Sequence, residues 1–123
     1  RRLEQPLGLE LRLVGFDEVA GLSHADVLVS TVPGPAQPGL AGGDPSLFGR
    51  LAGLAPVTFD VSYQPRRTPL LGAAMQTGNT VIEGLELLLR QAARQVELMT
   101  GVRPAPLAAM RIAGVAALEA TAL

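Results

Sequence analysis

The sequence predicts an α/β fold in which a mostly parallel sheet is covered by helices. Short apolar runs alternate with segments of helical period along most of the chain. Residues 25–32, ADVLVSTV, form a continuous run rich in β-branched residues, typical of a central strand buried on both faces of a parallel sheet. Residues 84–100 carry apolar side chains at the spacing of an amphipathic helix. This alternation indicates a doubly wound arrangement of strands and helices.

The first third of the chain predicts two strands and one short helix. Residues 9–14, LELRLV, alternate apolar and polar side chains, which favours a half-buried strand near a sheet edge. Asp17 is placed to cap a brief helix over residues 17–24. Residues 33–45, PGPAQPGLAGGDP, follow the central strand, and their proline and glycine content predicts a loop without regular structure.

The middle of the chain predicts a helix, a strand and a second helix. Residues 46–54 have helical character with Ser46 as the cap, and residues 56–61, PVTFDV, read as the next strand. Thr68 precedes a proline, which is the usual start of a helix, and Gly78 is expected to end that helix.

The C-terminal part predicts a short strand and two helices. Residues 79–82 form the strand, residues 84–100 the strongest helix with Gly101 as its terminator, and residues from about 106 to 123 an alanine-rich helix. A doubly wound domain needs more strands than these. We therefore expect the chain to be the end of something larger.

Composition excludes several kinds of chemistry. The 123 residues suffice for one domain, and a net charge of −1 with scattered arginines gives no footprint for nucleic acid. No apolar run is long enough for a membrane span, so a soluble cytoplasmic protein is the expectation. Cysteine and lysine are absent, and His24 is the single histidine, assigned to a surface loop. Thiolate chemistry, a Schiff base and a histidine pair for a metal are thereby excluded for these residues.

Ser30 and Thr31 stand where the most buried strand ends. Ligands of parallel α/β proteins bind outside the carboxyl ends of the strands, so these hydroxyls are candidates for ligand contact. An ordinary exit from strand to loop explains the same residues equally well.

The stretch FDVSYQPRRTPLL contains the only tyrosine, Tyr63, just after the strand 56–61. A phenol at this position can donate a hydrogen bond into a ligand crevice, although a lone tyrosine more often covers the edge of a core. Asp60 is suited to binding loop amides, and Arg66 and Arg67 read as solvated loop charges.

Gly84, Leu87 and Gln91 are spaced i, i+3 and i+7, which places them on one helical face near its start. The glycine permits close approach of a backbone or ring, and the glutamine offers both a donor and an acceptor. A tight turn and a solvent-facing glutamine are the alternative interpretation.

The two motifs FDVSYQPRRTPLL and GLELLLRQAARQVELMTG together resemble the C-terminal part of shikimate dehydrogenases. That family has an Asp-x-x-Tyr-x-Pro-x-x-Thr-Pro-Leu motif followed by a glycine-led helix that contains Gln-Ala. The upstream ADVLVSTVPG looks like the family's strand that leads to a segment beside the cofactor. The resemblance runs from about Leu9 to Met110 and implies an NADP-dependent enzyme that reduces 3-dehydroshikimate to shikimate.

The resemblance also implies roles for individual residues. Tyr63 and Gln91 would contact the substrate. The residues implied at the cofactor, mostly beside the nicotinamide, are Ser30, Thr31, Val61, Gly84 and Leu87. Arg1 and Arg2 match, by position alone, the basic segment that meets the 2′-phosphate.

The departures from the family concern the other half of the enzyme. The family's catalytic lysine and aspartate belong to an N-terminal substrate domain, and neither that domain nor the glycine-rich turn for the pyrophosphate is found here. The expected division is therefore residues 1–83 as the end of an incomplete Rossmann-like cofactor domain. Residues 84–123 would be C-terminal helices that pack on the substrate domain.

We expect no catalytic residue and no metal site within this chain, and no activity from it alone. Two alternatives stay open. One is a non-catalytic, shortened paralogue that binds a ligand or partner through the Ser30 to Gly34 segment and Tyr63. The other is a related dehydrogenase that accepts quinate or uses NAD. A homodimer is likewise left open by the sequence.

Overall fold

A parallel sheet of three strands forms the centre of the structure, a computed structural model that describes residue 8 and residues 10–121. The strands are β1 (Val27–Ser30), β2 (Val57–Asp60) and β3 (Thr80–Ile82), in the order β1-β2-β3. Their register aligns Val29 with Phe59 and Phe59 with Ile82. The α/β class predicted from the sequence is confirmed.

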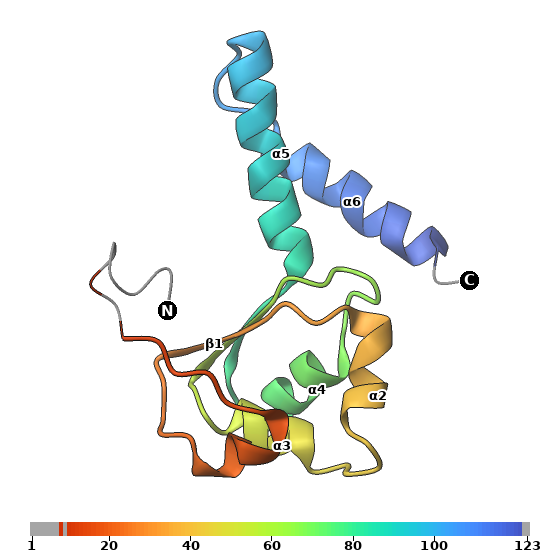
Figure 1. Ribbon diagram of the computed structural model, residues 1–123. Helices are drawn as coiled ribbons and strands as arrows, with labels where there is room; N and C mark the ends of the chain where they lie inside the picture. The colour runs from red at the N-terminus through yellow and green to blue at the C-terminus, as the bar shows by residue number, and fades with distance from the viewer. Residues whose placement is uncertain (1–7, 9, 122–123) are drawn as a thin grey trace.

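Helices connect the strands and extend beyond them (Figure 1). In chain order the helices are η1 (Phe16–Gly21), η2 (Gly34–Ala36), α2 (Gln37–Leu40), α3 (Leu47–Ala52), α4 (Pro69–Gln76), α5 (Gly84–Thr100) and α6 (Leu107–Thr121). Thr68 caps α4 through its side chain, which accepts from Leu71 N, and a proline follows it, as expected. Gly101 ends α5 with a left-handed φ of 73°, also as expected.

The core lies between one face of the sheet and helices α2, α3 and α4 (Figure 1). Thr58 and Asp60 of β2 point to this face and are fully buried. The buried apolar side chains of this layer are Leu47, Ala52, Leu70, Leu71 and Ala74. At the amino-terminal end of the strands, Asn79 Nδ2 donates to Ala52 O at 2.7 Å and to Ala55 O at 2.8 Å.

The other face of the sheet is apolar and open to solvent. Val29 is 52% exposed and Ile82 is 40% exposed, with the half-buried Phe59 between them in the register. The prediction that residues 25–32 form a central strand, buried on both faces, is therefore wrong. Among the described residues β1 and β3 are edge strands, and β2 is the central strand because it alone pairs on both sides.

Two other sequence predictions in the first third are wrong. Residues 10–14 form no strand and Leu13 is 99% exposed, because a strand needs a neighbouring strand and the sheet of the described part ends at β1. Asp17 does not cap a helix either. The 3-10 helix η1 begins one residue earlier, and Glu18 Oε2 accepts from the amide of Gly15 at 2.8 Å.

The proline- and glycine-rich stretch 33–45 contains the short helices η2 and α2, contrary to prediction. Pro35 and Pro38 lie in the first turns of these helices. Backbone N–H groups there have no partner within the helix, so a proline costs no hydrogen bond. The helix predicted over residues 46–54 exists, but Ser46 Oγ donates to Asp44 Oδ1 at 2.6 Å instead of capping it. The hydrogen bonds from Ser46 and Arg50 lower the pKa of Asp44 to about 2.

Helices α5 and α6 project from the sheet, with α5 rising from the end of β3 (Figure 1). Helix α6 packs on α5 at Gly114, where a Cβ would lie 3.3 Å from the side chain of Leu85. A forked ion pair joins the helices, with Arg111 Nε and Nη2 at 2.7 and 2.8 Å from the carboxylate of Glu86. In the part of the chain that the structure describes, no helix has the length and apolarity to cross a membrane.

The open sheet face leads to a first prediction. In the chain of these 123 residues, the double substitution Val29→Thr and Ile82→Thr should lower the binding of a dye specific for apolar surfaces. The free energy of unfolding should change by no more than about 0.5 kcal/mol per site, since exposed positions tolerate polar groups. Dye fluorescence and urea unfolding measure the two effects.

Val81→Thr is the matched control, because Val81 lies in β3 next to Ile82 but points to the helix-covered face. It should leave dye binding unchanged and destabilise by about 1 to 2 kcal/mol, since it places a hydroxyl among core groups. Equal destabilisation by both kinds of substitution would show that the Val29 face is covered.

Candidate functional site

The carboxyl ends of the three strands lie at one edge of the sheet, and the segments that follow them form the candidate site. Residues 31–36 follow β1, residues 61–67 follow β2, and helix α5 begins two residues after β3. Val61 N donates to Ser30 O at 3.0 Å, so the first two segments leave the sheet side by side.

A buried carboxylate holds these segments together. Asp60, at the end of β2, is fully buried and accepts three hydrogen bonds. Gln37 Nε2 donates to Oδ2 at 2.6 Å, Thr68 Oγ1 donates to the same oxygen at 2.7 Å, and Ser62 N donates to Oδ1 at 3.0 Å. These bonds compensate the cost of burying the charge. The expectation that Asp60 binds loop amides is confirmed by the Ser62 contact.

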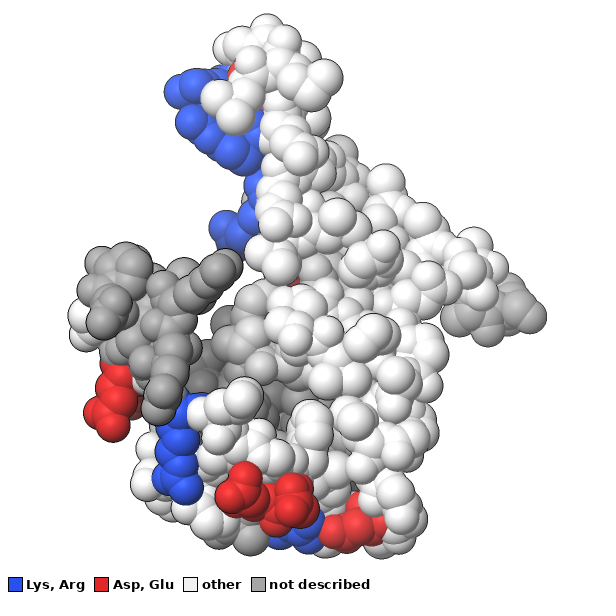
Figure 2. All heavy atoms as spheres, in the orientation of Figure 1, with Lys and Arg blue, Asp and Glu red and all other residues white. Residues whose placement is uncertain are grey.

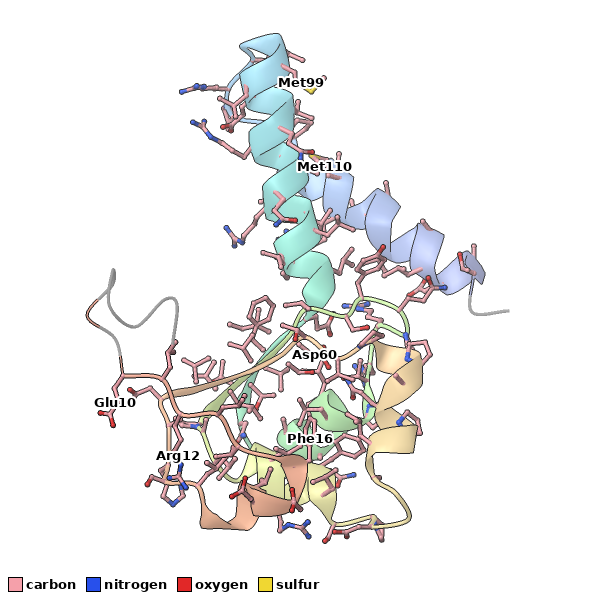
Figure 3. All side chains as sticks on the ribbon, viewed as in Figure 1. Glu10, Arg12, Phe16, Asp60, Met99 and Met110 are labelled. Atoms are coloured by element: carbon pink, nitrogen blue, oxygen red, sulfur yellow. The ribbon has the colours of Figure 1, made fainter. Side chains whose placement is uncertain are left out.

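Two glycines pack closely against the segment 61–67, which follows Asp60 (labelled in Figure 3) in the chain. A Cβ on Gly34 would lie 2.8 Å from Pro65 Cδ, and the Gly34 amide donates to Ser62 Oγ at 2.9 Å. From the side of α5, a Cβ on Gly84 would lie 2.5 Å from the carbonyl oxygen of Ser62 and closer still to that of Val61. Both approaches require the absence of a side chain. The segment is therefore held between the loop after β1 and the start of α5.

The structure brings some of the predicted site residues together. Val61 and the buried Gly84 are in direct backbone proximity, and Ser30 is joined to Val61 by its carbonyl. Leu87 is half-buried on the face of α5 that begins at Gly84.

Tyr63 is 44% exposed on the segment after β2. Gln91 is exposed on α5, and Thr31 is exposed after β1. Arg1 and Arg2 lie outside the described residues. His24 is exposed, as expected.

Arg66 is not a freely solvated charge, contrary to prediction. Its Nε lies 2.7 Å from Glu83 Oε2, just before α5, and this hydrogen bond and charge raise the pKa of Arg66. One turn further, the hydrogen bond from Arg111 lowers the pKa of Glu86. Figure 2 shows arginine side chains along one side of the projecting helix. Ion pairs thus tie the segment 61–67 and α6 to the start of α5.

A cavity of about 390 Å³ lies between the segment 61–67 and the end of α6, lined by Pro35, Gln64, Pro65, Arg66, Leu118 and Glu119. A second cavity of about 190 Å³ lies beside Ser30 and Thr31, and Gln37 forms part of its wall. No group of three or more metal-ligating side chains converges within the described residues. The site offers backbone groups, hydroxyls, the phenol of Tyr63 and side-chain amides.

Sequence reasoning missed Gln37 and Ser62, which shape the site, whereas Gly34 ends the candidate segment Ser30 to Gly34. Gln37 lies in a stretch whose composition predicted a loop, and no periodicity distinguishes it. Its signal was weak: a lone amide side chain between two prolines, shortly after a strand end.

The fold defines an α/β protein with a parallel sheet, and its candidate site lies at the carboxyl ends of the strands, where many nucleotide-binding proteins hold their ligands. Residues 84–112 match the family described as the shikimate 5′-dehydrogenase C-terminal domain. The chain belongs to the shikimate dehydrogenase family.

Individual relatives agree with this assignment. A shikimate dehydrogenase (NADP(+)) of Synechococcus is 38% identical over 96 residues, 73% of this chain and 33% of the relative. That of Dinoroseobacter shibae is 36% identical over 117 residues, 93% of this chain and 40% of the relative. The crystal structure of Mycobacterium tuberculosis shikimate dehydrogenase superposes with a TM-score of 0.63 at 41% identity, covering 97% of this chain and 40% of that one. The chain spans about two fifths or less of these relatives.

The contact at Gly84 yields the second prediction. Gly84→Ala should destabilise the protein by about 1 to 3 kcal/mol, because the new Cβ forces the carbonyls of Val61 and Ser62 away from α5. Urea unfolding with circular dichroism measures the change.

Gly72→Ala in α4 is the control, because a Cβ there meets no atom within 4 Å. It should be neutral or stabilising by up to about 1 kcal/mol, since alanine favours a helix interior over glycine. An equal loss from both substitutions would contradict the close packing at Gly84.

Proposed function

We propose that this chain is the cofactor-side, C-terminal part of an NADP(H)-dependent shikimate dehydrogenase that interconverts 3-dehydroshikimate and shikimate. One observation carries the proposal. The segment 61–67 is packed against the glycine that begins α5, so the two motifs that resemble the family form one continuous wall. The relatives in Synechococcus and Dinoroseobacter shibae are named shikimate dehydrogenase (NADP(+)), which supports the choice of cofactor and substrate.

Residues of this chain are proposed to contact the nicotinamide part of the cofactor. When bound, NADPH supplies the hydride for reduction of the substrate carbonyl. Val61 and Leu87 would give the nicotinamide an apolar wall, and the backbone of Gly84 would approach its edge. Ser30 and Thr31 would border the cofactor from the end of β1. A glycine-rich turn for the pyrophosphate is absent from the sequence, so the phosphate contacts are proposed to come from other residues.

Tyr63 and Gln91 are proposed to bind the substrate. A phenol and an amide supply donors and acceptors that match a ring bearing several hydroxyls. Both side chains are exposed on elements that meet at Gly84, which leaves them accessible to a ligand. Their role is to hold the substrate ring in the orientation required for hydride transfer.

The proton is proposed to come from outside this chain. No lysine occurs among the 123 residues, and the relatives are at least about 2.5 times longer than the matched part. We propose that residues 1–83 complete a cofactor domain and that residues 84–123 belong to the substrate-binding part.

The third prediction tests this division of labour. The chain of these 123 residues should not oxidise shikimate with NADP⁺, whereas the product of the complete reading frame should. Absorbance of NADPH is the readout, with quinate and NAD⁺ as parallel additions. Turnover by the 123 residues would refute the division. An inactive complete protein would refute the proposal that it is a dehydrogenase and would favour the non-catalytic binding module.

The fourth prediction concerns Gln91 in the active complete protein. Gln91→Ala should raise the KM for shikimate by about 5- to 30-fold, the equivalent of a hydrogen bond of about 1 to 2 kcal/mol. Gln95→Ala is the control, because Gln95 is an exposed glutamine one turn further along α5. It should change KM less than about twofold. Equal effects of the two substitutions, or none from Gln91→Ala, would contradict the assigned role.

A further inference from the structure

Gln37 is buried although it lies in a loop-like, proline-flanked stretch. Only 1% of its surface is exposed. Its side chain contacts three segments: Nε2 donates to Asp60 Oδ2 at 2.6 Å and to Val32 O at 3.4 Å, and Oε1 accepts from Leu70 N at 3.2 Å. Gln37 therefore joins the loop after β1, the end of β2 and the start of α4.

The loop after β1 and the loop after β2 are also joined by a direct hydrogen bond. Gly34 N donates to Ser62 Oγ, and Ser62 N donates to the Asp60 carboxylate that Gln37 also contacts. Within the described residues every buried side-chain nitrogen and oxygen has a hydrogen-bond partner. The loops after β1 and β2 are thus linked by a complete network and are expected to move as one unit.

We propose that Gln37 is a positioning residue that sets the distance between two segments of the site, Ser30 to Val32 at the cofactor and Val61 to Tyr63 at the cofactor and the substrate. The assignment of those segments rests on the proposed function. Gln37 contacts neither cofactor nor substrate in this proposal. It acts through Asp60 and through the amide of Leu70, which together fix where the segment after β2 leaves the sheet.

The physical basis is the cost of leaving buried groups unpaired. Without the glutamine amide, Asp60 loses one of three donors and Leu70 N loses its acceptor in a water-excluded place. The loops then shift to satisfy these groups by other means. A displacement of this kind lowers the affinity for a ligand that contacts both loops more than it lowers the rate of the chemical step.

The experiment uses the product of the complete reading frame and the variant Gln37→Met, which keeps the side-chain length and removes the hydrogen bonds. The KM for NADP⁺ should rise about tenfold while kcat falls less than about threefold. Amide hydrogen exchange should become faster at Gly34 and Ser62.

Asn79→Ala is the matched control. Asn79 also bridges separate segments through its amide, but at the amino-terminal end of the strands, where it donates to Ala52 O and Ala55 O. It should lower the unfolding temperature as Gln37→Met does and leave the KM for NADP⁺ within about twofold of the unmodified protein. Equal shifts in KM from both variants would reduce Gln37 to a purely structural role and overturn the proposal.

A charge exchange keeps the proposal testable if Gln37→Met does not fold. Gln37→Glu alone opposes two carboxylates and should raise the KM for NADP⁺, whereas Gln37→Glu combined with Asp60→Asn restores a donor facing a carboxylate. The double variant should recover the KM to within about threefold. Absence of recovery, or an unchanged KM in Gln37→Glu, would overturn the proposal.

The proposed function can fail separately. If the unmodified protein has no dehydrogenase activity, hydrogen exchange still decides about Gln37. Faster exchange at Gly34 and Ser62 in Gln37→Met but not in Asn79→Ala supports the link between the loops, and unchanged exchange refutes it.

Discussion

The buried carboxylate of Asp60 is the constraint on which the geometry of this edge of the sheet depends. A charge removed from water at the end of the central strand is tolerated only when donors surround it. Here the donors come from Gln37 at the start of α2, Ser62 in the segment after β2 and Thr68 just before α4. Satisfying one carboxylate therefore fixes three chain segments at once. Thr68 also caps α4, so the helix start and the loop end are determined together.

Two glycines also fix the position of the segment that Asp60 holds. Asp60 holds the segment 61–67 from inside the core, while Gly34 and Gly84 let neighbouring backbone approach it from two outer sides. Ion pairs contribute less, because Arg66 and Arg111 are partly solvated and such pairs are worth little in water. The wall that carries Val61 and Tyr63 is consequently shaped mainly by backbone packing and buried hydrogen bonds, which are local, short-range and intolerant of added atoms.

Local signals in the sequence were sufficient for the elements that depend on neighbours in the chain. Thr68 followed by Pro69, the left-handed Gly101 and the apolar period of α5 encode their structure within one or two turns. The caps expected at Asp17 and Ser46 failed because of neighbours two or three residues away. The failures in strand burial and in the stretch 33–45 involve partners far away in the sequence. Burial of β1 depends on what covers it, Leu13 depends on a neighbouring strand, and α2 in the stretch 33–45 depends on Gln37 reaching Asp60, 23 residues away. For the site, the motifs predicted the residues on the wall, and the structure added the residues that hold the wall in place.

The two faces of the sheet bear on how the proposed enzyme is divided. One face is covered by α2, α3 and α4, and the other exposes Val29 and Ile82, although parallel sheets are stable when both faces are buried. The chain also corresponds to at most about two fifths of its relatives. An apolar face and a matched fraction of this size point to the same conclusion. The residues that cover the open face and those that supply the proton are proposed to belong together, in the part of the enzyme that this chain does not match. The groups that hold the site wall in place, Asp60, Gln37 and the two glycines, all lie within this chain. We therefore expect the remaining polypeptide to dock against a wall whose buried side-chain groups, within the described residues, are already hydrogen-bonded.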